Sequence, residues 1–86
     1  MKYFEVYEPY YALIKEESKE KAMKVYVEFV ASDEGTLKDE MYEVSRTAAW
    51  RKFCKGENED GSKSYELVKQ FNDQDNKVLL IDSALL

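Results

Sequence analysis

The sequence opens with two aromatic-rich segments, separated by a proline, in which the side chains alternate between two faces with period two. Of all features in the sequence, this pair restricts the possible folds most. Residues 2–8 (KYFEVYE) place Phe4 and Val6 on one face and tyrosines on the other, as a strand does. Residues 10–15 (YYALIK) alternate in the same way. Pro9 cannot donate a ladder hydrogen bond, so it marks a turn. The chain is therefore expected to begin with a β-hairpin across this proline, although the turn lacks an Asn-Gly pair.

A helical repeat follows the predicted hairpin. Ser18 is suited to cap a helix, and Glu20 places a carboxylate in its first turn. Across residues 19–31 (KEKAMKVYVEFVA), apolar side chains recur at helical spacing, namely Ala22, Tyr26, Phe29 and Val30. This pattern predicts a helix that ends in the loop SDEGT, residues 32–36.

The middle of the chain, residues 37–56 (LKDEMYEVSRTAAWRKFCKG), fits a helix better than a strand. Thr36 and Asp39 resemble a capping arrangement. Apolar residues then follow a helical repeat, namely Leu37, Met41, Val44 and Ala48. A period-two interpretation of residues 44–54 mixes charged and apolar side chains on one face, which is typical of a poor strand. We expect a helix broken near Ser45, with a strand as the alternative.

The C-terminal part predicts one more helix and one more strand. Residues 64–73 (SYELVKQFND) form a short amphipathic repeat that would bury Leu67, Val68 and Phe71. Residues 78–81 are a continuous apolar run, typical of a strand covered on both faces. A chain of 86 residues leaves room for a single domain, residues 1–86. The predicted fold class is α+β, a small three-stranded antiparallel sheet packed with two to three helices in the order β-β-α-α-α-β.

Composition excludes several kinds of function. The 13 basic and 18 acidic residues give a net charge of −5, which disfavours direct binding of nucleic acid or of an anionic membrane. The chain has no histidine, and Cys54 is its single cysteine. We therefore expect no enzyme activity, cofactor, metal site or disulfide, and a location in the host cytoplasm. Arg46, Arg51 and Lys52 form a small basic cluster that is expected on the polar face of the middle helix.

The glycine-bracketed acidic segment GENEDG, residues 56–61, invites comparison with a calcium loop. If Gly61 is placed at loop position 6, positions 1 and 12 fall on Gly56 and Leu67. Neither residue supplies a carboxylate, so the bidentate ligand of an EF-hand is missing. The glycine spacing is also wrong for a phosphate loop. The segment is therefore predicted to be a solvated acidic turn, either idle or used as a contact surface.

Acidic pairs and tyrosines are the remaining candidates for a contact surface. Two interpretations of the acidic residues are open. They cap helices and keep the chain soluble, or several of them gather on one face that imitates the line of phosphates in DNA. The tyrosines can all be core residues, or can line the hairpin as interface anchors. The candidate partner-binding residues are Glu57, Glu59, Asp60, Asp73, Asp75, Asp33, Glu34, Tyr3, Tyr7 and Tyr10.

Three segments together resemble small acidic proteins of phages and mobile elements of Gram-positive bacteria. They are KYFEVYEPYYALIKEESKEKAMKVYVEFVA at the start, GENEDG in the middle and VLLIDSALL at the end. The resemblance spans most of the chain and rests on overall pattern, with no catalytic residue to carry over. It implies a phage context, in which such proteins often inhibit host defence enzymes, CRISPR nucleases included.

Two hypotheses of different classes follow. In the first, the chain binds and inhibits a host defence effector, and its acidic and tyrosine side chains occupy a basic nucleic-acid groove of that protein partner. In the second, the chain is a structural or regulatory module that forms a homodimer through a sheet edge or through its C-terminal leucines, Leu85 and Leu86.

Overall fold

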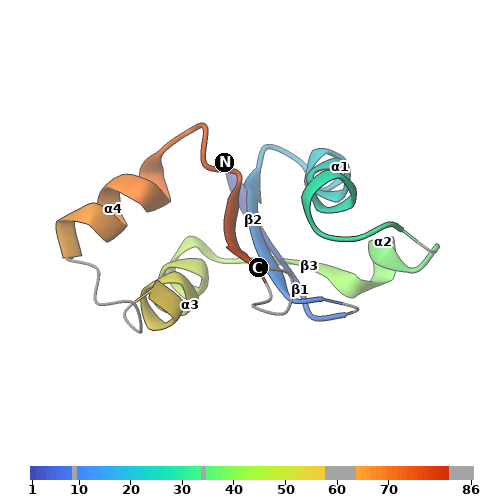
Figure 1. Ribbon diagram of the computed structural model, residues 1–86, viewed down its shortest axis with the longest axis horizontal. Helices are drawn as coiled ribbons and strands as arrows, with labels where there is room; N and C mark the ends of the chain where they lie inside the picture. Colours follow the sequence, from blue (N-terminus) through green and yellow to red (C-terminus); the bar gives the residue numbers. More distant parts are fainter. Residues whose placement is uncertain (9, 34, 58–63, 82–86) are drawn as a thin grey trace.

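The computed structural model describes residues 1–8, 10–33, 35–57 and 64–81. In chain order its elements are β1 (Lys2–Val6), β2 (Ala12–Glu16), α1 (Lys19–Phe29), α2 (Leu37–Glu40), β3 (Met41–Val44), α3 (Arg46–Glu57), α4 (Ser64–Asn72) and β4 (Val78–Ile81). The strands form one antiparallel sheet in the order β3-β1-β2-β4. Figure 1 shows α1 and α2 on one face of this sheet, with α3 and α4 on the other. None of the described helices is long and apolar enough to cross a membrane.

The hairpin predicted at the start of the chain is confirmed and forms the centre of the sheet. Its register pairs Phe4 with Ile14 and Val6 with Ala12. These four side chains therefore share one face, and all are buried. Because β3 lies beside β1 and β4 lies beside β2, both outer edges of the hairpin are covered. A sheet edge that could pair with a second copy therefore belongs to β3 or β4, not to the hairpin.

The first hydrophobic core lies between the sheet and α1. Ala22 and Tyr26 of α1 pack with the hairpin residues, and Leu37 and Met41 close the core from α2 and β3. The predicted N-cap is confirmed, because the Oγ of Ser18 accepts a hydrogen bond from the backbone N–H of Lys21 at 3.3 Å. We call this cluster the α1-side core.

The middle segment differs from the helix that its pattern predicts. Residues Met41–Val44 form a strand that pairs with β1, with Met41 opposite Val6 and Val44 opposite Tyr3. The predicted order β-β-α-α-α-β and the three-stranded sheet are therefore wrong in detail, whereas the α+β class is confirmed. Thr36 makes no side-chain capping bond. The predicted break near Ser45 is confirmed, because the Oγ of Ser45 accepts a hydrogen bond from the N–H of Ala48 at 3.1 Å where α3 begins.

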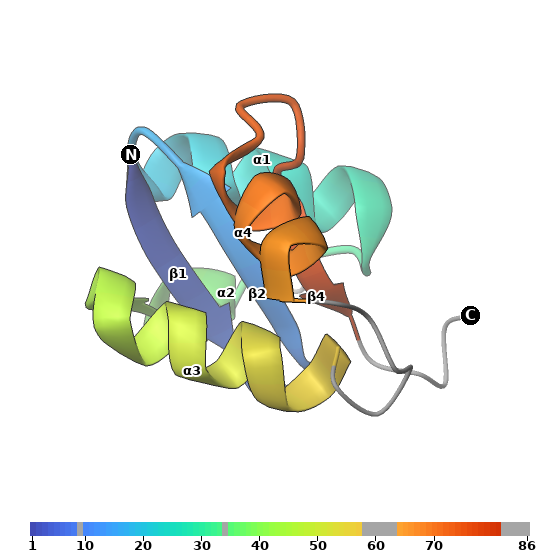
Figure 2. The same ribbon diagram turned by 90° about the vertical axis from the view of Figure 1, so that its left-hand side faces the viewer.

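The second hydrophobic core lies on the opposite face, beneath α3 and α4 (Figure 2). Phe71 is its central ring, stacked on Tyr3 with centroids 5.1 Å apart and met edge-on by Trp50, also at 5.1 Å. Phe53 and Leu67 are buried around it, as the helical repeat of α4 predicts for Leu67. Val68, which we also expected to be buried, is 46% exposed. We call this cluster the α3/α4-side core.

The predicted C-terminal strand is confirmed as β4, at an edge of the sheet. Ala12 of β2 faces Ile81 and Leu13 faces Leu80, and the register shifts between Leu13 and Ile14. Leu79 is buried in the α3/α4-side core. The other three residues of β4 are half-buried, so the apolar run is covered less fully than an interior strand would be.

Candidate functional site

Two candidate residues from distant parts of the sequence, Tyr10 and Asp33, line the same hollow. It has a volume of about 360 Å³ and lies between the β1–β2 connection, the end of α1 and α2. Glu8 and Glu40 bring two further carboxylates to it. We call these four residues and the space between them the acidic hollow. Tyr26, Thr36 and Leu37 form part of its wall.

The position of Tyr10 is fixed by a buried phenol beneath it. The hydroxyl of Tyr26 accepts a hydrogen bond from the backbone N–H of Tyr10 at 3.3 Å and donates one to its carbonyl at 3.0 Å. Burial raises the pKa of Tyr26, so this hydroxyl keeps its proton and can act as donor and acceptor together. The backbone of Tyr10 is thereby held to α1, and its own side chain remains 37% exposed at the hollow.

Asp33 is fixed by the turn that leads into α2. Its Oδ1 accepts hydrogen bonds from the N–H groups of Gly35 at 2.7 Å and Leu37 at 3.3 Å. Gly35 has a φ of 101°, a left-handed conformation that favours glycine. Asp33 thus takes the role that the sequence assigns to Thr36. Its Oδ2 has no hydrogen-bond partner among the described residues.

The acidic hollow has the chemistry of a receptor for a basic side chain. Three acidic residues and one exposed tyrosine line the hollow, and an ammonium or guanidinium group is attracted both to carboxylates and to aromatic rings. Within the described ranges, no three histidine, cysteine or acidic side chains converge in a way that could hold a metal ion. The sequence missed Glu8 and Glu40 because nothing in the spacing of residues 8, 10, 33 and 40 shows that the β1–β2 connection meets α2.

The other two candidate tyrosines have different surroundings. Tyr3 is only 5% exposed, so it is not available as a surface anchor, because its ring packs on Phe71 in the α3/α4-side core. Tyr7 is 52% exposed, and its hydroxyl donates to Glu5 at 2.6 Å. The three tyrosines Tyr3, Tyr7 and Tyr10 therefore do not form one row along the hairpin.

Glu5 is the centre of a polar cluster that the sequence did not predict. Its carboxylate is almost buried and accepts hydrogen bonds from the hydroxyls of Tyr7 and Tyr11, both at 2.6 Å. The Nζ of Lys52 lies 3.9 Å from the same carboxylate. Burial and the hydrogen bond to Glu5 raise the pKa of Tyr11, and the hydrogen bond to Glu5 raises that of Tyr7. Both phenols therefore stay neutral and serve as donors to a buried charge.

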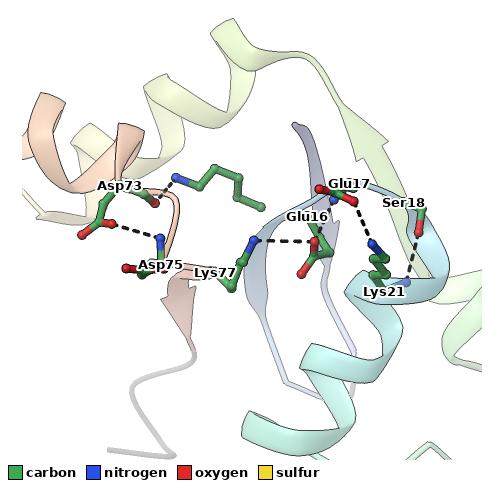
Figure 3. Close-up of polar contacts among 8 residues, drawn as sticks. Glu16, Glu17, Ser18, Lys21, Asp73, Asp75 and Lys77 are labelled. Atoms are coloured by element: carbon green, nitrogen blue, oxygen red, sulfur yellow. Dashed lines mark hydrogen bonds and ion pairs between the residues drawn. The ribbon is translucent and has the colours of Figure 1, made fainter.

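Asp73 and Asp75 belong to the connection between α4 and β4, far from the acidic hollow. The Oδ1 of Asp73 accepts a hydrogen bond from the N–H of Asp75 at 3.0 Å. Figure 3 shows the two residues beside Lys77, whose Nζ lies 3.7 Å from the Oε1 of Glu16. Figure 1 places this connection next to α4, whereas Asp33 follows α1 on the other side of the sheet. The described acidic candidates thus do not gather on one face.

The side chains of four candidates lie outside the part of the chain that the structure describes. Glu57 is the last residue of α3, and nothing is assigned to its side chain. Glu34, Glu59 and Asp60 lie outside the described residues, as does most of the acidic segment GENEDG. Their proposed contact role stays a prediction from the sequence.

Comparison with known proteins places these observations in context. The YosH C-terminal domain family matches residues 1–80. The chain is also 43% identical, over 89 aligned positions, to the SPbeta prophage-derived uncharacterized protein YosH of Bacillus subtilis strain 168. That alignment covers 100% of this chain and 57% of the relative, so the chain spans little more than half of the relative's length. No solved structure matches the chain.

Proposed function

Because the chain belongs to the YosH C-terminal domain family and is similar to a prophage-derived protein, we propose that it is a non-catalytic binding module of a phage protein. Its partner is a protein with a basic surface, and the contact is made at the acidic hollow. A nucleic-acid enzyme of the host defence, such as a CRISPR nuclease, has the basic groove that this chemistry requires. The chain would inhibit that enzyme by occupying the groove.

The observation that carries the proposal is that Glu8, Asp33 and Glu40 line one hollow together with Tyr10. Together with a net charge of −5, this arrangement favours the approach of a cationic protein and the insertion of a lysine or arginine side chain. The described acidic candidates lie on two sides of the sheet, so they do not form one extended acidic face that could imitate the phosphates of DNA. The proposed contact is therefore a socket for one or two basic side chains.

The test begins with capture of partners from host lysate on immobilised protein, followed by binding measurements on the purified partner. The double variant Glu8→Gln with Glu40→Gln removes two charges from the hollow and leaves the turn made by Asp33 intact. Its matched control is Glu20→Gln with Glu28→Gln, which removes two charges from exposed positions of α1. We expect the hollow variant to bind about tenfold more weakly than the control variant.

Two results would count against this proposal. Equal weakening by the two double variants would assign the effect to net charge alone. Capture only of partners that have no basic surface would contradict the proposal that the acidic hollow binds basic side chains. Inhibition itself is measured as loss of nuclease cleavage when the protein is added, and the hollow variant should restore cleavage.

A homodimer is the second candidate, and the outer edge of β3 favours it. In the described part of the chain, β3 pairs only with β1, and Tyr42 on it is 57% exposed. An uncovered edge strand can add a strand from a second copy. Sedimentation equilibrium decides between the two states, since the variant Tyr42→Lys should reduce the mass of an edge-paired dimer to that of one chain.

A further inference from the structure

A second hollow lies at the end of the sheet where β1 begins and where β2 and β3 end, and it has the opposite charge character. Its volume is about 350 Å³, and it is lined by residues of β1, β2, β3 and α3 and by the segment that ends α4. Three cationic side chains from three elements border it, namely Lys2, Lys15 and Arg46. In a chain with a net charge of −5, such a concentration of cations is unexpected. We call it the basic hollow.

Lys15 is the member that distinguishes this hollow from a chance group of surface lysines. Its side chain is 2% exposed, and its ammonium donates to the carbonyls of Phe71 at 2.6 Å and Asp73 at 2.5 Å. No carboxylate lies within 4 Å of this ammonium among the described residues. An ammonium has three N–H donors, and two of them bind these carbonyls, so the third N–H can donate to another acceptor. A buried cation without a carboxylate favours an external anion.

The start of α3 adds a second source of positive potential. Ser45 caps this helix of 12 residues by accepting from the N–H of Ala48, which leaves the N–H groups of Arg46 and Thr47 without a hydrogen-bond partner among the described residues. Such N–H groups at the start of a helix attract anions. Arg46 is oriented there by a hydrogen bond from its Nη2 to the Oδ1 of Asn72 at 2.6 Å. The Asn72 amide N–H groups donate no hydrogen bond among the described residues, and Asn72 also lines the hollow. The planar guanidinium of Arg46 matches two oxygens of a tetrahedral anion.

Two further groups bear on the charge of the hollow. Tyr3 is 5% exposed and lines it, and its hydroxyl has no hydrogen-bond partner among the described residues. Glu43 is a lining carboxylate, and it lies 3.9 Å from the Nζ of Lys2. Burial lowers the pKa of Lys15, Asp73 raises it, and the nearby charges of Lys77 and Arg46 lower it again. An anion placed among these cations would relieve their mutual repulsion.

We propose that the basic hollow binds the phosphate group of a small molecule, held by Lys2, Lys15 and Arg46 at the N-terminus of α3. Phosphate suits the site better than a carboxylate does, because a tetrahedral dianion can accept from the guanidinium, the ammonium groups and the helix N–H groups together. The volume of about 350 Å³ leaves room for a substituent on the phosphate. This site is separate from the acidic hollow, and neither proposal depends on the other.

The experiment is a titration of isotope-labelled protein with inorganic phosphate at constant ionic strength, followed by amide NMR shifts. We expect saturable shifts at residues 46–48 and at the side-chain amide of Asn72. Arg46→Gln should weaken binding about tenfold. Arg51→Gln, the same change at an exposed position of α3 outside the hollow, should alter it by less than about twofold. Glu43→Gln removes the opposing carboxylate and should strengthen binding.

The gain in affinity from Glu43→Gln separates a binding role from a merely structural one, because a damaged fold would not bind more tightly. Acetate and glycerol 3-phosphate complete the series. Tighter binding of glycerol 3-phosphate than of inorganic phosphate indicates a phosphorylated small molecule, and equal binding indicates free phosphate. Acetate binding as tightly as phosphate would overturn the assignment. So would shifts that do not saturate, or equal losses in Arg46→Gln and Arg51→Gln.

Discussion

The ammonium of Lys15 in β2 donates a hydrogen bond to the backbone carbonyl of Phe71, 56 positions away in the sequence, at 2.6 Å. It also donates to the carbonyl of Asp73, so one buried cation satisfies two carbonyls at the end of α4. The neighbouring backbone N–H of Lys15 donates to the carbonyl of Lys77 at 2.8 Å. This one residue therefore bonds both the end of α4 and the residue before β4 to the central hairpin.

Lys15→Met should lower the free energy of unfolding by about 2 kcal/mol, because methionine keeps the apolar stem but cannot donate a hydrogen bond. The buried carbonyl of Phe71 then loses the ammonium donor, and the carbonyl of Asp73 keeps only the N–H of Asn76. Urea unfolding measures the change. Lys24→Met, at an exposed position of α1, serves as the control and should change stability by less than about 0.5 kcal/mol. Equal effects of the two substitutions would show that the ammonium–carbonyl bonds contribute little.

Tyr26→Phe should cost about 1–2 kcal/mol, since the backbone N–H and carbonyl of Tyr10 lose their shared partner while the ring still fills the α1-side core. Thermal unfolding gives the loss of stability. Hydrogen exchange at the Tyr10 amide should quicken more than exchange within β1. Tyr42→Phe removes a hydroxyl from an exposed ring and should be neutral. An unchanged Tyr10 exchange rate in Tyr26→Phe would contradict this account.

Stability should fall as the pH rises above about 10, the ordinary pKa of tyrosine in the unfolded chain. Burial and the bond to Glu5 raise the pKa of Tyr11 in the folded protein, so above this pH the unfolded chain releases a proton that the folded protein retains. The stabilisation is complete below pH 10 and decreases by about 1.4 kcal/mol per pH unit above it. Urea unfolding at several alkaline pH values measures this slope.

The variant Tyr11→Phe isolates this effect from other groups that titrate at alkaline pH. Lys15 acts in the opposite direction, because its pKa is lowered on folding and its contribution therefore rises with pH below the ordinary lysine value. The difference between the slopes of wild type and Tyr11→Phe removes the lysine contribution. Identical slopes would mean that Tyr11 ionises equally in both states.

Ser45→Ala should destabilise the protein by about 1 kcal/mol, because the N–H of Ala48 at the start of α3 loses its acceptor. Circular dichroism during thermal unfolding measures this change. Thr47→Ala, two residues further along the same helix at an exposed position, should be neutral or slightly stabilising. The opposite ranking of the two variants would remove the capping role of Ser45.

The strand β3 shows why the sequence predicted only part of the fold. Met41 and Val44 are three residues apart, which fits a helical repeat, yet on a strand this spacing places them on opposite faces. Both are covered because helices pack on both faces of the sheet, with Met41 in the α1-side core and Val44 against the other. Local periodicity cannot reveal this arrangement, since it depends on pairing with β1.

The candidate site divides in the same way. Tyr10 and Asp33 were singled out from residue type, and the structure brings them together. Glu8, Glu40 and the Glu5 cluster were missed, because their partners lie on elements that only the tertiary fold brings near. The hairpin, the Ser18 cap and the helical repeat of α1 are local signals and were therefore predictable, whereas the cap expected at Thr36 was wrong.

The central hairpin separates the two hydrophobic cores and contributes side chains to both. This arrangement affects how the sequences of relatives can diverge. Each strand of the hairpin presents alternate residues to the two sides, so one helical layer contacts only half of them. A substitution in α1 need not be compensated in α3 or α4 as long as the hairpin keeps its alternation. Relatives can thus be expected to exchange or remodel one layer freely while the layer across the sheet stays recognisable.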